Sequence, residues 1–145
     1  MKRWIVGLAV AALTGAGVGA MAPGATAATT PTCQVTYKVI SQWSTGFSVD
    51  GLIKNTGTTT IGPGWTLAFA FGDSGQVVQL GWAIGLTQSG RQVTGTNMPW
   101  NASIPPGGGV RIGFNGGLTG ANPPPAEFTL NGARCSAVIN PPGAL

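Results

Sequence analysis

Histidine is absent from this chain of 145 residues, and only three of its residues are acidic. Without histidine there is no imidazole to act as a general base, and no Ser-His-Asp or Cys-His group for nucleophilic catalysis. Hydrolysis of a glycosidic bond needs two carboxyl groups that flank it. The local sequences around Asp50, Asp73 and Glu127 give no indication that any two of them converge. The sequence therefore predicts a protein that is not an enzyme.

Cysteine is also scarce, because Cys33 and Cys135 are the only two, and they bracket most of the chain. Two cysteines without any histidine lack the ligands of an ordinary zinc site, so we expect no metal and no other cofactor. In an oxidising compartment the two would form a disulfide, and the alternative is a pair of free thiols. A bond that closes a loop of about 100 residues would stabilise the fold by roughly 4–5 kcal/mol.

The first 27 residues have the order of a secretory signal peptide. Lys2 and Arg3 precede an apolar run from Ile5 to Val18, and Ala25-Thr-Ala27 then supplies a cleavage site of small residues. An uncleaved membrane anchor is the alternative, but the run is short and rich in glycine for a membrane span. We therefore expect residues 1–27 to be removed, residues 28–32 to form a short tail, and the mature protein to be secreted.

Charge is sparse in the rest of the chain. The cations beyond residue 27 stand singly in the sequence, as Lys38, Lys54, Arg91, Arg111 and Arg134. Cations that are isolated in this way argue against binding to nucleic acid. No second long apolar run follows the leader, so we expect no membrane contact and a soluble monomer.

Short runs rich in β-branched and aromatic residues alternate with turn signals of Gly, Pro, Asn and Asp. The clearest is Trp65–Phe71, where the large side chains fall at every second position, the period of a strand with one buried face. The runs are Val35–Ile40, Thr45–Asn55, Trp65–Phe71, Gln76–Leu80, Arg91–Asn97, Gly109–Asn115, Ala126–Leu130 and Ala133–Val138. They predict an all-β fold, an antiparallel β-sandwich of the jelly-roll or immunoglobulin-like kind over residues 33–138, with a tail at 139–145.

The five tryptophans fall into different settings. Trp4 lies in the leader, and Trp65 shares the buried face of its predicted strand, so it belongs to the core. Trp43, Trp82 and Trp100 instead lie beside Gly, Pro or small polar residues. Several exposed tryptophans mark a binding surface, and an aromatic ring packs well on the C–H face of a sugar. From the pattern alone these three are either such a surface or scattered core and rim residues.

A series of short motifs runs in order between the two cysteines. They are Cys33-Gln-Val-Thr-Tyr37, Gln42-Trp-Ser-Thr-Gly-Phe47, Lys54-Asn-Thr56, Gly64-Trp-Thr-Leu67, Gln88-Ser-Gly90, Pro99-Trp-Asn101, Ile104-Pro105, Gly113-Phe-Asn-Gly116 and Phe128-Thr-Leu-Asn-Gly132. In order and spacing the chain resembles a family 2 carbohydrate-binding module. The resemblance implies a non-catalytic β-sandwich whose terminal cysteines are joined. It also implies a flat face of three tryptophans, which match Trp43, Trp82 and Trp100.

The resemblance also bears on the ligand. Xylan-binding members tend to carry an arginine three residues after the first surface tryptophan, which turns that ring on edge. This chain has Gly46 there, which lets Trp43 lie flat and favours the branch that binds cellulose and often chitin. We therefore expect an insoluble polysaccharide, most of all crystalline cellulose, as the partner. The alternatives are an extracellular protein-interaction or adhesion domain, and an accessory fragment of a glycoside hydrolase.

The polar contacts that the resemblance implies are Asp50, Asn101, Arg111 and Asn115. Some polar positions depart from the common pattern of the family. Leu80 stands where Gln or Asn is frequent, Asp50 where Asn is common, and Arg111 where Gln is. The stacking residues are kept while the hydrogen-bonding rim is altered, so the change concerns ligand preference rather than binding itself.

Overall fold

The computed structural model describes residues 30–141, so the predicted leader and parts of both predicted tails lie outside the described residues. This part of the chain forms nine strands and one short 3-10 helix. They are β1 Cys33–Trp43, β2 Gly46–Asn55, β3 Thr66–Ala70, β4 Val77–Trp82, β5 Ile84–Ser89, β6 Gln92–Asn97, η3 Pro99–Asn101, β7 Gly109–Gly117, β8 Phe128–Leu130 and β9 Ala133–Asn140. Among these residues no helix is long and apolar enough to cross a lipid bilayer.

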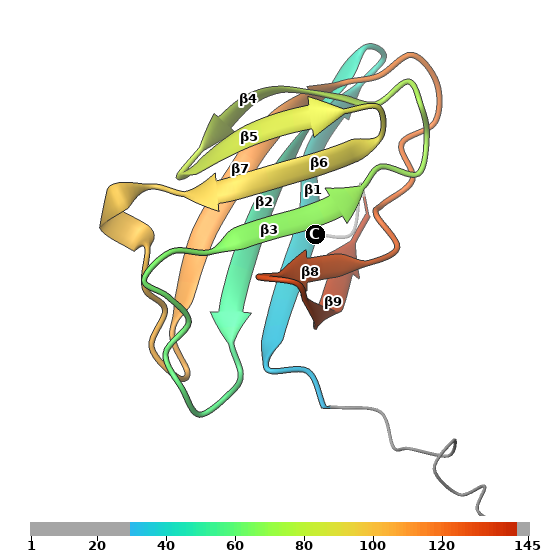
Figure 1. The fold of residues 1–145 in the computed structure, drawn as a ribbon. Coiled ribbons are helices and arrows are strands. Elements are labelled where there is room, and N and C mark those ends of the chain that lie inside the picture. The colour runs from blue at the N-terminus through green and yellow to red at the C-terminus, as the bar shows by residue number, and fades with distance from the viewer. Residues whose placement is uncertain (1–29, 142–145) are drawn as a thin grey trace, which may run out of the picture. The chain divides into compact units, whose positions relative to one another are not determined.

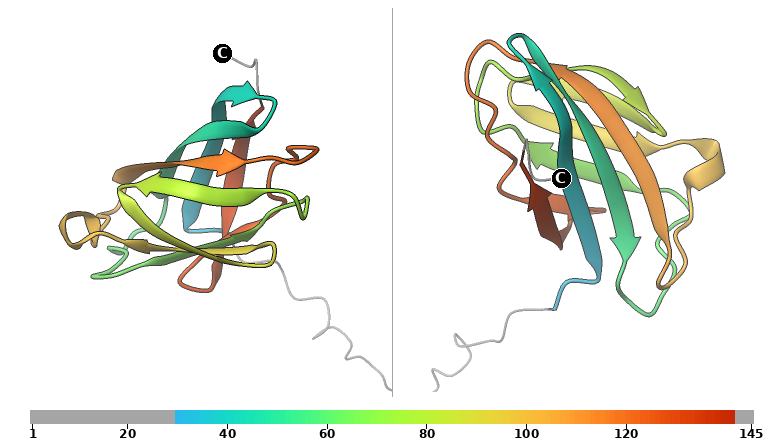
Figure 2. Two further views of the ribbon diagram at one scale, coloured as in Figure 1. Left: turned by 90° about the horizontal axis from the view of Figure 1, so that it is seen from above. Right: turned by 180° about the vertical axis from the view of Figure 1, so that it is seen from behind.

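The strands form two layers that face each other across the core. One layer has the order β4-β7-β2-β1 and the other has the order β5-β6-β3-β8. In Figure 1 the second layer lies in front of β7, β2 and β1, and the view from behind brings β1, β2 and β7 to the front (Figure 2, right). The prediction of an all-β sandwich is therefore confirmed.

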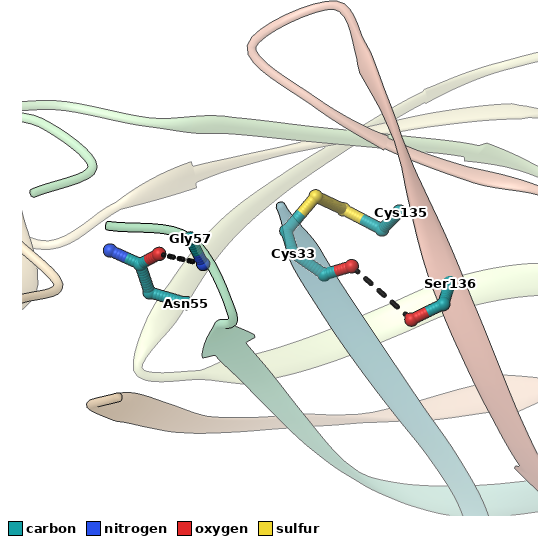
Figure 3. The surroundings of a disulfide bond; sticks show 5 residues. All are labelled: Cys33, Asn55, Gly57, Cys135 and Ser136. Carbon is teal, nitrogen blue, oxygen red and sulfur yellow. Dashed lines mark hydrogen bonds between the residues drawn. A yellow bond between two sulfur atoms is a disulfide. The ribbon is translucent and has the colours of Figure 1, made fainter. Parts of the chain in front are cut away.

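β9 joins the two layers at one edge. Its residues Ala133–Cys135 pair antiparallel with β8, and Ser136–Asn140 pair parallel with β1. This parallel pair departs from the purely antiparallel sandwich that we predicted. It links all nine strands into one hydrogen-bonded sheet that is nearly closed. The Cys33–Cys135 disulfide lies where β9 changes partner, and the Ser136 hydroxyl donates to the Cys33 carbonyl nearby (Figure 3).

The core is made by the alternating side chains of both layers, as the sequence period requires. On β2, Phe47, Val49 and Ile53 are buried while Ser48, Asp50 and Leu52 are only half-buried on the opposite side. Trp65 is buried, as predicted, and its Nε1 donates to the Asn101 carbonyl at 2.8 Å.

The two ends of the strand order, β4 and β5, meet at a seam where Gln88 takes the place of a neighbouring strand. Its Oε1 accepts from the Val78 backbone N–H at 2.7 Å, and its Nε2 donates to the Gln76 carbonyl at 2.9 Å. Backbone groups at a sheet edge need such partners when they are removed from water. Gln88 thereby holds β4, a strand of the first layer, in place.

Eight of the nine strands were predicted, with differences at their ends. β5 was not predicted, because Ile84 and Leu86 are its only large apolar residues. β1 runs on to Trp43, and β4 runs on to Trp82, so both tryptophans end strands rather than occupying loops. β9 continues to Asn140, two residues into the predicted tail.

Tyr37, the only tyrosine, provides a probe of the core. Its side chain is 3% exposed among Phe69, Phe114 and Phe128, and within residues 30–141 its hydroxyl has no hydrogen-bond partner. Burial raises the pKa of the Tyr37 phenol well above its ordinary value, because the charged phenolate is poorly solvated there.

We expect the folded protein to show no tyrosinate absorbance at about pH 11, one unit above the ordinary pKa of tyrosine. Above about pH 10 the unfolded chain loses this proton and the folded chain keeps it, so the free energy of unfolding falls by about 1.4 kcal/mol per pH unit. Tyr37→Phe should remove this part of the fall in the free energy of unfolding at alkaline pH. Titration of the phenol near pH 10 in a folded protein would contradict the account.

Candidate functional site

The outer face of the first layer carries two of the exposed tryptophans, and we call it the tryptophan face. Its side chains are the outward residues of β4, β7, β2 and β1. Trp43 and Trp82 end β1 and β4, and their exposed fractions are 46% and 40%. Trp100 lies in η3, with an exposed fraction of 70%. In both Figure 1 and the right view of Figure 2 the segment around residue 100 projects beside the end of β4.

Each strand tryptophan lies over a glycine of the neighbouring strand. Trp43 is paired in register with Gly46, and Trp82 is paired with Gly113. A Cβ atom on Gly46 would come 2.7 Å from Cζ2 of Trp43, and one on Gly113 would come 2.1 Å from Cζ2 of Trp82. No real side chain tolerates such distances, so the absence of Cβ lets each indole lie against the sheet.

The register also sets how far apart the two rings lie. Gly46 is paired with Gly117 on β7, which is four residues beyond Gly113. Four residues of an extended strand span roughly 13 Å. The aromatic surface is therefore longer than a single sugar ring, and it matches an extended chain better than a monosaccharide.

Asn101 connects the third tryptophan to the second. Its side chain is buried, with 6% exposed, although the sequence predicted a surface contact. Its Oδ1 accepts from the Met98 backbone N–H at 2.7 Å, and its Nδ2 donates to the Ala83 carbonyl at 2.8 Å. Ala83 follows Trp82 directly and has a positive φ of 64°. Asn101 thus lies beneath the surface and fixes η3 against the turn that ends β4.

Polar and apolar side chains occupy the row between the two strand tryptophans. Ser48 and Leu80 are both paired in register with Asn115, and Leu80 is exposed. The Ser48 hydroxyl donates to Oδ1 of Asn115. The Nδ2 group is the part of Asn115 that can donate to a sugar hydroxyl.

Asp50 and Arg111 form an ion pair on the same face, with 3.1 Å between Oδ2 and Nη1. Asp50 is paired in register with Gly113, the glycine beneath Trp82. The structure therefore brings Asp50, Arg111 and Asn115 together on the face of Trp43 and Trp82, whereas Asn101 lies below it.

The three carboxylates are engaged separately. Asp50 pairs with Arg111, Glu127 lies 3.4 Å from Arg134, and Asp73 accepts from the Gly75 backbone N–H at 2.9 Å. The hydrogen bond from Gly75 to Asp73 is typical of an aspartate in a turn. Within residues 30–141 no three His, Cys, Asp or Glu side chains gather in a group that could hold a metal ion.

Two features of the site escaped the sequence analysis. The sequence predicted Gly113 only as a residue of a strand, although the Trp82 indole packs against it. Only the register of β4 against β7 reveals this. Gln88 belongs to the motif Gln88-Ser-Gly90, but its hydrogen bonds to Gln76 and Val78 depend on a seam between β4 and β5 that forms only in the folded chain.

The chain is similar to a family of binding domains and to several proteins that contain such a domain. The family model described as cellulose binding domain matches residues 33–135. Exoglucanase B of Cellulomonas fimi is 54% identical over 104 residues, which make up 72% of this chain and 9% of that protein. A cellulose/chitin binding protein of Mycobacterium bovis is 36% identical over 135 residues, with 91% of this chain and 92% of that protein covered.

A solved structure of a chitin-binding domain from Streptomyces coelicolor matches with a TM-score of 0.58 and 36% identity. The match covers 72% of this chain and 94% of that chain. By contrast, the chain spans 9–30% of the length of the first three curated relatives that it matches.

Proposed function

Since the chain belongs to the family of cellulose binding domains, we propose that it holds crystalline cellulose on Trp43, Trp82 and Trp100. Residues 33–135 are a non-catalytic domain that binds polysaccharide. The observation that supports the flat mode of binding is the seating of the indoles of Trp43 and Trp82 on Gly46 and Gly113. A ring that lies against a sheet offers its face to a sugar ring, as stacking requires.

The exposed polar residues of the tryptophan face complete the proposed site. Asn115 offers a donor to sugar hydroxyls in the row between the two strand tryptophans. Asp50 and Arg111 offer an acceptor and donors beside Trp82, and their exposed ion pair contributes little to stability. Gly46 sets the orientation of Trp43, and Asn101 positions η3 and so Trp100.

Chitin is proposed as a second ligand of the same surface. Cellulose and chitin share flat chains whose sugars expose C–H faces, so a stacking surface without charge selectivity accepts both. The likeness to a chitin-binding domain and to a cellulose/chitin binding protein supports this proposal.

The test is a depletion assay of the pure protein on insoluble cellulose, chitin and xylan. We expect retention on cellulose and chitin and little on xylan. Failure to bind any insoluble glycan, together with retention on a protein partner, would overturn the proposal in favour of an adhesion role. Release of soluble sugar from cellulose by the pure protein would also contradict it.

We further propose that the protein works outside the cell as a monomer after loss of residues 1–27. The disulfide supports an oxidising location, because cytosolic thiols are kept reduced. Mass spectrometry of the exported protein tests the cleavage after Ala27. A mass in solution of one chain tests the monomer.

A further inference from the structure

Cations that are isolated in the sequence gather on one face in the fold. Lys38, Lys54 and Arg111 occupy outward positions of β1, β2 and β7, where they alternate with buried residues. Lys38 is paired in register with Asp50, and Asp50 is paired with Gly113 beneath Trp82. The three cations therefore belong to the tryptophan face. The expectation that the cations are scattered holds for the sequence but not for the surface.

The net charge of the described residues resides on this face. It carries three cations and one carboxylate, whereas the remainder of residues 30–141 carries two of each sign, Arg91, Arg134, Asp73 and Glu127. The outer face of β3, β6 and β5 is formed by Thr, Ser, Ala, Gln and Gly residues and has no charged position. The net positive charge is therefore concentrated on the tryptophan face and is not spread evenly over the surface, as a role in solubility alone would allow.

Two of the three cations, Lys38 and Lys54, form no ion pair within residues 30–141. Asp50 forms its ion pair with Arg111. In the part of the chain that the structure describes, neither Lys38 nor Lys54 has a carboxylate oxygen within 4.0 Å of its ammonium group. Lysine ammonium groups beside a stacking surface attract anionic groups of a ligand that lies on it, and salt screens this attraction.

We propose that Lys38 and Lys54 form an anionic-ligand margin of the tryptophan face, which favours polysaccharides that carry carboxylates over neutral ones. Suitable ligands are glycans with uronic acid residues or with sugars oxidised to the acid at C6. This inference rests on the proposed stacking function. It adds a charge-dependent preference that the tryptophans alone do not supply.

The test measures binding isotherms on one batch of cellulose, either untreated or oxidised at C6 to carboxylate. At low salt we expect roughly tenfold tighter binding to the oxidised form, and near-equal binding at about 0.5 M NaCl. The double variant Lys38→Gln/Lys54→Gln should lose this preference and keep its affinity for untreated cellulose. The matched control Arg91→Gln/Arg134→Gln removes the same charge elsewhere and should keep the preference.

Equal affinity of the wild-type protein for both forms would overturn the proposal, as would the same loss in both double variants. Salt-sensitive binding to duplex DNA that the lysine substitutions abolish, without any preference for oxidised cellulose, would also overturn it and assign the cations to nucleic acid. Failure of the stacking function is distinguishable, because it would abolish binding to untreated cellulose.

Discussion

Trp82→Ala is expected to weaken binding to insoluble cellulose roughly thirtyfold, about 2 kcal/mol, as for a central aromatic of an interface. The Trp82 indole lies over Gly113 on the tryptophan face, so its loss removes the proposed stacking surface. Because its side chain is partly exposed already, the free energy of unfolding should change little. Depletion isotherms and urea denaturation measure the two quantities.

Two glycine variants provide a matched control for this result. In Gly113→Ala, the new methyl group would collide with the Trp82 indole and displace it, so binding should fall although every tryptophan is present. In Gly85→Ala, on the opposite layer, the nearest side-chain atom is Oγ1 of Thr96 at 3.4 Å, so binding should persist. Wild-type affinity of Gly113→Ala would contradict the flat seating of Trp82.

Removal of the disulfide by Cys33→Ala/Cys135→Ala is expected to lower the free energy of unfolding by about 4–5 kcal/mol. The bond links residues 102 apart in sequence, so it restricts a long loop of the unfolded chain. It also holds β9 where that strand passes from β8 to β1. Urea denaturation of the double variant and of the wild-type protein measures the difference.

Binding by the disulfide variant should remain near that of the wild-type protein at temperatures where the variant is folded, because both cysteines lie away from the tryptophans in the strand register. A loss of less than about 1 kcal/mol would contradict this account, because it would show that the disulfide contributes little by restricting the unfolded chain.

The sandwich could be predicted because its strands follow the simplest rule, alternation of buried and exposed residues. The alternation in Trp65–Phe71 predicts which face is buried, and in the structure Trp65, Leu67, Phe69 and Phe71 are buried. β5 escaped because its exposed side carries Gly and Thr, which match a turn as well as a strand. The parallel pairing of β9 with β1 could not be predicted, since it joins the two ends of the chain.

The site was predicted in its aromatic members and only partly in its geometry. The local sequence and the family resemblance singled out Trp43, Trp82 and Trp100. The seating of an indole on a glycine depends on register between strands distant in sequence, so Gly113 was missed. The family resemblance implied that Asn101 contacts the ligand, but its side chain is buried and its amide group hydrogen-bonds to the backbone of Met98 and Ala83.

The most direct test of the tryptophan face is a titration of the protein with a soluble cello-oligosaccharide, followed by nitrogen–proton correlation spectra. The four tryptophans among the described residues each give one indole signal. We expect the signals of Trp43, Trp82 and Trp100 to shift together. The signal of Trp65 should stay in place, because its Nε1 donates a hydrogen bond to the Asn101 carbonyl in the core. Binding that leaves the three surface indoles unchanged would contradict the account.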